Sequence, residues 1–164
     1  MPSTAAALPP LSSVDLQQFI DRHEIQATIL ILNQHTPTVR DAARALDVVP
    51  ERIIKSLVFM VGDEPLLVIN NGLARVDRRK LAASLGVSRK RVKFAEAGQA
   101  LEITGFVIGS MPPFGHRQKL PTLVDRNVLD LDLIFGGGGG IDAMLRLTPS
   151  ELLRTTDARV RELV

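Results

Sequence analysis

The chain has 164 residues, a length that fits one domain built around one core. Apolar residues make up 45% of the sequence and charged residues 23%, which excludes wholesale disorder and fibrous repeats. The net charge of +2 is too small to indicate a nucleic-acid partner by itself. Cys, Trp and Tyr are absent, so the sequence excludes thiolate chemistry and argues against an aromatic platform for stacking bases.

The N-terminal segment, residues 1–11, contains three prolines and three consecutive alanines without periodicity. This composition predicts a flexible leader, followed by a single domain over residues 12–164. No apolar run has the length needed to span a bilayer, and the first residues lack the features of a secretory signal. We therefore expect a cytoplasmic protein with no membrane partner.

The first half of the chain contains signals for helices and strands in alternation. Apolar residues at helical spacing predict a helix over 13–22, and the apolar run 29–32 predicts a buried strand. Thr36 is then the expected N-cap of a helix with Pro37 at its first position, ending near Asp47.

Two apolar runs, 53–61 and 66–70, are separated by turn residues and predict a hairpin. A helix is expected over 77–85, with Gly86 as its C-terminal stop. Further short strands are expected at 92–94, 106–108, 122–125, 133–135 and 143–147, and a last helix at 148–155. Because several links are hairpin-like, we predict an α/β (α+β) fold with a mixed, largely antiparallel curled sheet and flanking helices.

The segment 75–93 has an uneven charge. It holds eight basic residues and one acidic residue, Asp77, so it carries +7 and leaves the rest of the chain at −5. Such an asymmetry is typical of a surface that follows a phosphate backbone. A solvated helix face followed by a basic turn is the commoner explanation for a charge run of this kind.

The usual catalytic signatures are absent from the sequence. His23, His35 and His116 are its only histidines, and no acidic cluster at metal-ligand spacing accompanies them, so we expect no metal site. No Gly-x-Ser-x-Gly elbow is present. The five glycines at 136–140 lack the lysine of a phosphate-binding loop. The sequence therefore favours chemistry without a triad, a metal or a cofactor.

Two local features remain as candidates for a site. In the segment 105–115 an apolar run leads into a loop stiffened by Pro112 and Pro113, which can present backbone amides to an oxyanion; a structural turn is the simpler hypothesis. Lys55 interrupts the apolar run 53–61, where a buried charge would need a partner or ligand. Lys55 at a solvated strand edge is the simpler hypothesis here.

The order of motifs along residues 13–164 resembles the YbaK and prolyl-tRNA-synthetase-associated editing domains. Four segments carry the resemblance: Thr38-x-x-x-Ala42-Ala43-x-x-Leu46, Ile53-x-Lys55-Ser56-Leu57-Val58-Phe59, Gly105-Phe106-Val107-Ile108-Gly109-x-x-Pro112-Pro113-Phe114-Gly115 and Leu120-Pro121-Thr122-Leu123-Val124-Asp125. An ordered set of motifs is more specific than any one of them. The glycine-rich segment and residues 147–153 continue the resemblance towards the C-terminus.

The resemblance implies a free-standing aminoacyl-tRNA deacylase that hydrolyses the ester of a mischarged tRNA. The expected substrate is a mischarged tRNA(Pro) or a tRNA that carries a small amino acid. Such editing is needed because a synthetase separates side chains that differ by one methylene by only about 1–3 kcal/mol. The resemblance also implies that hydrolysis uses a positioned water, assisted by the 2′-hydroxyl of the substrate, and no metal or cofactor. A binding module of the same fold that holds tRNA or a synthetase without cleavage is the alternative.

The resemblance assigns roles to individual residues of this chain. The implied catalytic residues are Lys55, Gly109, Ser110 and Met111. The implied substrate-binding residues are Pro112, Pro113, Phe114, Gly115, Thr38, Ser56, Gly137, Gly138 and Met144. The implied tRNA-binding residues are Arg78, Arg79, Lys80, Arg89, Lys90 and Arg91, which would face the acceptor end, and an aminoacyl-tRNA synthetase is a second candidate partner.

Met144 departs from the pattern of the family. Members that act on cysteinyl-tRNA tend to carry an acidic residue where our alignment places Met144. The resemblance therefore implies a small aliphatic or hydroxylated substrate in place of cysteine. Alanine, serine, threonine and 2-aminobutyrate remain equal candidates.

Overall fold

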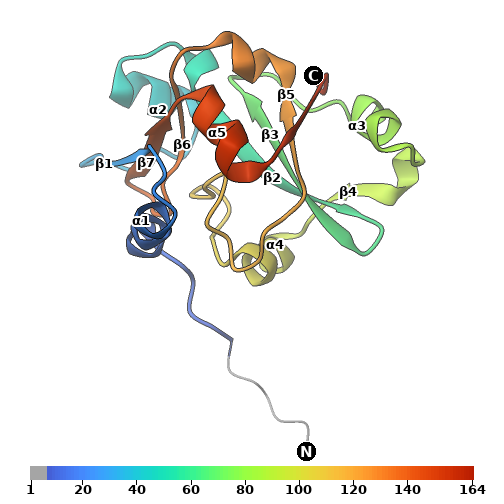
Figure 1. Ribbon diagram of the computed structural model, residues 1–164, viewed down its shortest axis with the longest axis horizontal. Coiled ribbons are helices and arrows are strands. Elements are labelled where there is room, and N and C mark those ends of the chain that lie inside the picture. Colours follow the sequence, from blue (N-terminus) through green and yellow to red (C-terminus); the bar gives the residue numbers. More distant parts are fainter. Residues whose placement is uncertain (1–6) are drawn as a thin grey trace, which may run out of the picture.

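The computed structural model describes residues 7–164 and places them in two adjoining sheets with helices around them (Figure 1). Residues 1–6 of the expected leader lie outside the described residues. The helices are α1 (Ser13–Arg22), α2 (Val39–Leu46), α3 (Arg78–Leu85), α4 (Ala97–Thr104) and α5 (Pro149–Thr156). The strands are β1 (Thr28–Ile31), β2 (Ile54–Val61), β3 (Glu64–Asn71), β4 (Val92–Phe94), β5 (Thr122–Asp125), β6 (Ile134–Gly137), β7 (Ala143–Leu147) and β8 (Arg159–Arg161).

The two sheets combine antiparallel and parallel pairs. The larger sheet has the order β4-β2-β3-β5-β8, in which β3 with β5 and β5 with β8 are parallel. The smaller sheet, β1-β7-β6, is antiparallel throughout. A bridge between Ile53 and Phe135 joins them just before β2. The predicted fold class, mixed and largely antiparallel with flanking helices, is confirmed.

The helix ends follow from local chemistry, with one shift from the sequence prediction. The expected N-cap Thr36 is wrong, because Thr38 caps α2: its hydroxyl accepts from the amide of Asp41 at 3.1 Å, and the helix begins at Val39. The Thr36 amide instead donates to the carbonyl of Ile141 at 3.4 Å. At the end of α3, Gly86 adopts φ +68° as the expected stop, a conformation that glycine accepts without strain.

The structure differs from the predicted elements at four places. The strand expected at 106–108 is wrong: the chain there forms turns after α4, a helix that the sequence analysis did not predict. The short strand β8 was also not predicted. The strand expected at 133–135 lies at Ile134–Gly137, so it includes the first two residues of the glycine run. The hairpin β2–β3 and the strands at 92–94, 122–125 and 143–147 are confirmed.

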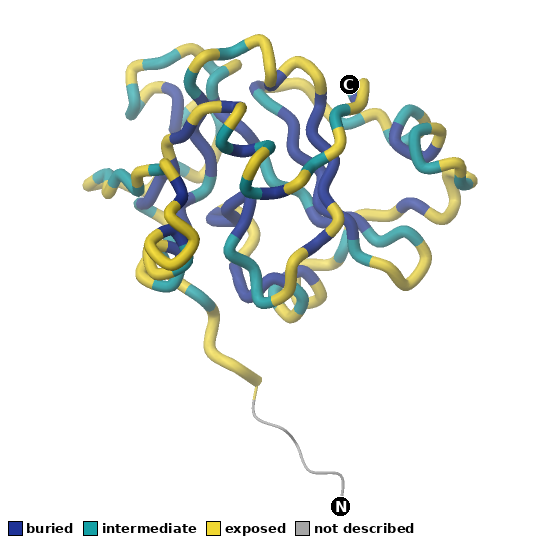
Figure 2. Tube along the Cα trace, in the orientation of Figure 1, coloured by how far each residue is buried: buried dark blue, intermediate teal, exposed yellow. Residues whose placement is uncertain are grey.

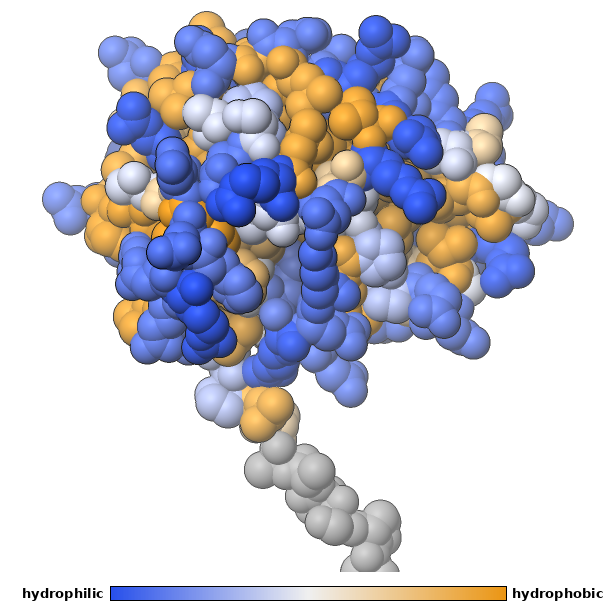
Figure 3. All heavy atoms as spheres, in the orientation of Figure 1, coloured by the Kyte–Doolittle hydropathy of each residue, from blue (hydrophilic) through white to orange (hydrophobic). Residues whose placement is uncertain are grey.

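Buried side chains concentrate along the central strands, whereas the outer side of α1 and the turns are exposed (Figure 2). The main core lies between the sheets, α1 and α5, and a second cluster packs Leu81 of α3 against the larger sheet. A third cluster packs Ala42 and Ala43 of α2 against Phe135 and Met144. In Figure 3 hydrophilic residues cover most of the face that carries α1 and α5, with apolar residues exposed between them.

The end of the expected leader contacts the folded domain. The Leu11 amide donates to the carbonyl of Gly105 at 2.7 Å, and the Leu11 side chain packs against the main core. The Arg117 guanidinium donates to the carbonyl of Pro9 at 2.6 Å. No helix among residues 7–164 is long and apolar enough to cross a bilayer.

Candidate functional site

A cleft of about 360 Å³ opens where the two sheets separate. Strand β2 pairs with β3 along its whole length, but β4 pairs only with Phe59–Val61 on the other side. The bridge at Ile53 is the link to the smaller sheet. On the edge of β2 that faces away from β3, no strand of the described chain pairs with residues 55–57, which lie between the β4 pairing and the Ile53 bridge. The cleft lies at this uncovered stretch, between β2, α2 and the loop that follows α4.

Lys55 is the one charged residue among the described residues that line this cleft. It lies near the start of β2, is half-buried, and faces Asn70 across the strand pair. Its ammonium donates to the carbonyl of Ala74 at 2.6 Å. The lysine thus lies at the uncovered edge of β2, where this exposed hydrogen bond ties it to the chain that leaves β3.

Asn70 and Ala74 were not singled out in the sequence. Asn70 is completely buried, and its side-chain amide donates to the same Ala74 carbonyl at 2.9 Å. Its side-chain oxygen receives no hydrogen bond from the described residues. Asn70 therefore positions the carbonyl that holds Lys55. A buried asparagine opposite a lysine in an apolar hairpin was the available sequence signal, but it required the strand register.

Burial, and secondarily the charge of Arg75, lower the pKa of Lys55 below the ordinary lysine value of 10.5. Both factors disfavour the ammonium form: burial removes water from the charge, and Arg75 repels it. The fraction of ammonium therefore declines at a lower pH than for a lysine in water. Any role that requires the charged form weakens as the pH rises through this lowered pKa.

Arg75→Ala is expected to raise the pKa of Lys55 towards 10.5 without reaching it, because the repulsion disappears while the burial remains. An NMR pH titration of the lysine side-chain carbons measures this shift. Arg79→Ala is the matched control, since Arg79 is also an exposed arginine of the basic segment but is not a cause of the Lys55 shift. An unchanged titration in Arg75→Ala would exclude the repulsion.

The loop after α4 brings Gly109 and Met111 to the cleft. Gly109 has φ +97°, a conformation that a residue with a side chain would adopt only with strain. The Ser110 amide donates to the carbonyl of Val107 at 3.1 Å, and the Ser110 hydroxyl donates to the same carbonyl at 3.0 Å. The Ser110 amide is therefore already engaged within the loop, whereas the amides of Gly109 and Met111 donate to no other described residue.

Glycines of the run 136–140 support this loop by backbone contact. A Cβ at Gly137 would lie 2.3 Å from the carbonyl oxygen of Met111, and a Cβ at Gly138 would lie 2.6 Å from the carbonyl carbon of Ala143. The Gly139 amide donates to the Ser110 carbonyl at 2.9 Å. The run is thus a packing surface for the loop, and Gly137 also lines the cleft.

The opposite wall comes from α2 and β7. Met144 and Thr36 line it together, with the Thr36 hydroxyl 4.0 Å from the Met144 sulfur. Thr38 also lines the cleft, although its hydroxyl caps α2. Ser56 lines the cleft as well, and its hydroxyl is buried without a hydrogen bond to a described residue.

The cleft does not contain every residue that the resemblance assigned to it. Pro113, Phe114 and Gly115 line a different cavity, and Ser110, Pro112 and Gly138 line neither of the two. The physical reason is the direction of the chain: after Met111 the two buried prolines carry it away from Lys55 and towards α1. Lys55, Gly109, Met111, Thr38, Ser56, Gly137 and Met144 are the predicted residues that the structure brings together.

The six basic residues assigned to tRNA have two different environments. Arg78 donates to the carbonyl of Val92 at 3.1 Å, and Lys80 donates to the carbonyl of Val164 at 2.6 Å, so both help to fix α3. The other four are exposed: Arg79, Arg89, Lys90 and Arg91. Residues 7–164 contain no group of three or more histidine, aspartate or glutamate side chains that could hold a metal ion.

Comparison with known proteins identifies the class to which this fold and cleft belong. The family model of the aminoacyl-tRNA editing domain matches residues 33–155, and the chain belongs to this family. The resemblance drawn from the sequence motifs is thus confirmed. The match includes both Lys55 and the loop that carries Gly109.

Individual relatives agree with this assignment. The chain is 30% identical over 124 residues to the uncharacterized protein YwhH of Bacillus subtilis, covering 75% of this chain and 77% of YwhH. It is 31% identical over 98 residues to the proline–tRNA ligase of Ligilactobacillus salivarius, covering 60% of this chain but 17% of the ligase. A solved structure described as a candidate trans-editing enzyme for prolyl tRNA synthetase superposes with a TM-score of 0.86 at 31% identity, covering 92% of this chain and 95% of that one.

Proposed function

We propose that this protein hydrolyses, in trans, the ester bond of a mischarged aminoacyl-tRNA, with tRNA(Pro) carrying a small amino acid as the substrate. The observation that carries the proposal is the cleft that Lys55 lines together with Gly109 and Met111. Membership of the editing family and the likeness to a candidate trans-editing enzyme for prolyl tRNA synthetase support it.

The proposed mechanism uses the groups in the cleft without a metal. The amides of Gly109 and Met111 donate to the ester carbonyl oxygen as it gains negative charge, which is the largest stabilising effect in acyl transfer. Lys55 binds and orients the acceptor end through its charge. A water held beside the ester attacks the carbonyl carbon with assistance from the 2′-hydroxyl of the substrate. The bond between the carbonyl carbon and the ribose oxygen breaks, a proton from the water passes to that oxygen, and the free amino acid leaves.

The test is single-turnover deacylation of a panel of tRNA(Pro) species charged with alanine, serine, threonine, cysteine or 2-aminobutyrate. We expect at least one to be hydrolysed faster than in buffer, and cysteine to be a poor substrate because Met144 offers no acidic group. Rates equal to those in buffer for the whole panel, with tRNA binding retained, would instead establish the alternative of a non-catalytic binding module. A minimal aminoacyl ester hydrolysed as fast as the charged tRNA would show that the tRNA body is not recognised.

Neutralising two exposed basic residues, Arg89 and Lys90, to glutamine is expected to weaken tRNA binding and to flatten its salt dependence. Each lost phosphate contact lowers the slope of log K against log salt by about one unit. Binding measured at several salt concentrations gives this slope. Arg159→Gln with Arg161→Gln is the matched control, because these exposed arginines lie on β8, outside the basic segment. Equal slopes for wild type and the Arg89/Lys90 variant would remove these residues from the tRNA surface.

A further inference from the structure

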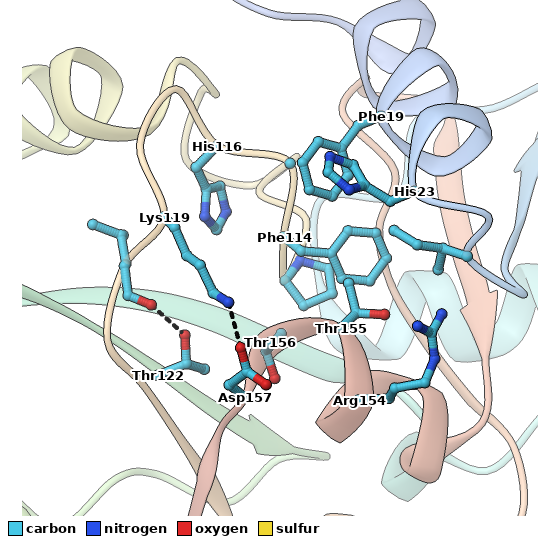
Figure 4. Close-up of a pocket in the computed structure, with 14 residues that line it drawn as sticks. Phe19, His23, Phe114, His116, Lys119, Thr122, Arg154, Thr155, Thr156 and Asp157 are labelled. Carbon is cyan, nitrogen blue, oxygen red and sulfur yellow. Dashed lines mark hydrogen bonds and ion pairs between the residues drawn. The ribbon is translucent and has the colours of Figure 1, made fainter.

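A second cavity, of about 400 Å³, lies away from Lys55, between α1, α5 and the segment 113–120 (Figure 4). Its volume falls in the range of about 300–1,000 Å³ that is typical of small-molecule sites. None of the residues that line it lines the Lys55 cleft. The proposed hydrolysis does not use this cavity, so it needs a separate explanation.

One side of the cavity is apolar and aromatic. The rings of Phe19 and Phe114 stack with their centroids 6.0 Å apart and 25° between their planes. The centroid of the His23 ring lies 4.3 Å from that of the Phe19 ring. Ile25 and Leu120 are buried beside them. Figure 4 shows the two phenylalanines together on one side, opposite Lys119. Such a wall suits the side chain of an apolar or aromatic ligand.

The other side presents opposite charges next to each other. Lys119 forms an ion pair with Asp157, and the two side chains are 69% and 74% exposed. An ion pair this exposed contributes little to stability, so a ligand can exchange for it at little cost. A ligand with both an anionic and a cationic group can satisfy Lys119 and Asp157 at once, whereas a simple anion or cation satisfies only one of them.

His116 adds an acceptor to the wall. Its Nε2 lies 2.8 Å from the carbonyl oxygen of Pro112, and because a carbonyl only accepts, Nε2 carries the hydrogen and donates. Burial lowers the pKa of His116 more than this hydrogen bond raises it, which favours the neutral ring. Nδ1 then has a free lone pair. Figure 4 shows the ring beside Lys119, across the cavity from Phe114.

We propose that this cavity binds a free α-amino acid with an apolar side chain. The side chain packs on Phe19 and Phe114, the carboxylate pairs with Lys119, and the ammonium group pairs with Asp157. His116 accepts a further hydrogen bond from the ammonium group. The site is separate from the proposed hydrolytic cleft, and its occupancy does not depend on whether that cleft cleaves an ester.

The test is a titration of the ¹⁵N-labelled full chain with L-phenylalanine, followed by NMR. We expect saturable shifts at the amides of residues 113–120 and 155–157, at about millimolar concentration as for other ligands of this size. Phenethylamine lacks the carboxylate, 3-phenylpropionate lacks the ammonium group, and glycine lacks the side chain. Each is expected to bind more weakly. Equal shifts with phenethylamine or 3-phenylpropionate would refute the requirement for both charged groups of the amino acid. The absence of shifts with L-phenylalanine would refute the proposed site.

Substitutions of the two exposed charged side chains then test where the ligand binds. Lys119→Gln and Asp157→Asn are each expected to weaken L-phenylalanine binding about fivefold, the effect of one exposed charge pair. Asp157 has φ +52°, which asparagine tolerates, so Asp157→Asn keeps the backbone. Arg146→Gln, an exposed arginine on β7, is the control. Unchanged affinity in both cavity variants, or an equal loss in Arg146→Gln, would refute the assignment.

Discussion

Lys55→Ala is expected to lower the single-turnover rate of deacylation by about 100-fold or more, the usual cost of removing one preorganised charge or donor from an acyl-transfer site. Lys55 is the one charge among the described residues that line the cleft, and it is half-buried. In such surroundings no neighbouring side chain of the cleft can replace the ammonium. The effect should therefore appear in the rate even at saturating tRNA.

The fold should survive this substitution. The variant loses the hydrogen bond from Lys55 to the Ala74 carbonyl, which contributes about 1 kcal/mol, so the melting temperature should fall only slightly. Lys55→Met keeps the aliphatic stem and separates loss of charge from loss of packing. Arg159→Ala removes a positive charge from exposed β8 and should leave the rate unchanged. A folded Lys55→Ala variant with the wild-type rate would remove Lys55 from the site.

The strand pattern and the motif order could be predicted from the sequence because they depend on local patterns. The apolar runs on either side of residues 62–65 can pair only as a hairpin, and the structure pairs Lys55 with Asn70 in it. Lys55 stood out because it interrupts an apolar run. Its surroundings could not be predicted, since the Ala74 carbonyl reaches it only after the chain turns back at the end of β3.

The segment after α4 shows where apolar composition misleads. Phe106 is completely buried, but Val107 and Ile108 are 50% and 56% exposed, so the run does not alternate as a strand would. The Thr104 hydroxyl accepts from the Phe106 amide at 3.1 Å and ends the helix together with Gly105 at φ +86°. Side-chain capping of this kind competes with strand formation and is not visible in hydropathy.

The direction of the proline-bearing loop could not be predicted from the sequence either. The sequence showed a stiff loop, but not which of its faces meets which cavity. In the structure Gly109 and Met111 line the Lys55 cleft, whereas Pro113, Phe114 and Gly115 line the other cavity. Stiffness is a local property of the two prolines, whereas the choice of face depends on α1 and the glycine run, which pack on the loop from distant parts of the chain.

Gly137→Ala is expected to abolish most deacylation and to destabilise the protein by about 1–3 kcal/mol, as overpacking of a tight contact does. Its Cβ would lie 2.3 Å from the Met111 carbonyl oxygen, 2.7 Å from the Met111 carbonyl carbon and 2.9 Å from the Ser110 carbonyl carbon. All three are backbone atoms, so the loop itself must move. Because Gly109 and Met111 line the cleft from this loop, the movement displaces the residues whose amides we propose to bind the oxyanion.

Gly140→Ala is the matched control for Gly137→Ala, since it lies in the same glycine run but its Cβ would meet nothing closer than 3.5 Å. The rate and the thermal melt should stay near wild type in Gly140→Ala and fall together in Gly137→Ala. If Gly137→Ala folds, the oxyanion role also requires that the deacylation rate fall while the affinity for tRNA is unchanged. The affinity should be unchanged because the basic segment, which is proposed to bind tRNA, is remote from the glycine run in sequence and does not line the cleft. A Gly137→Ala variant with both the wild-type rate and the wild-type melt would show that contact between the run and the loop does not hold the catalytic amides in place.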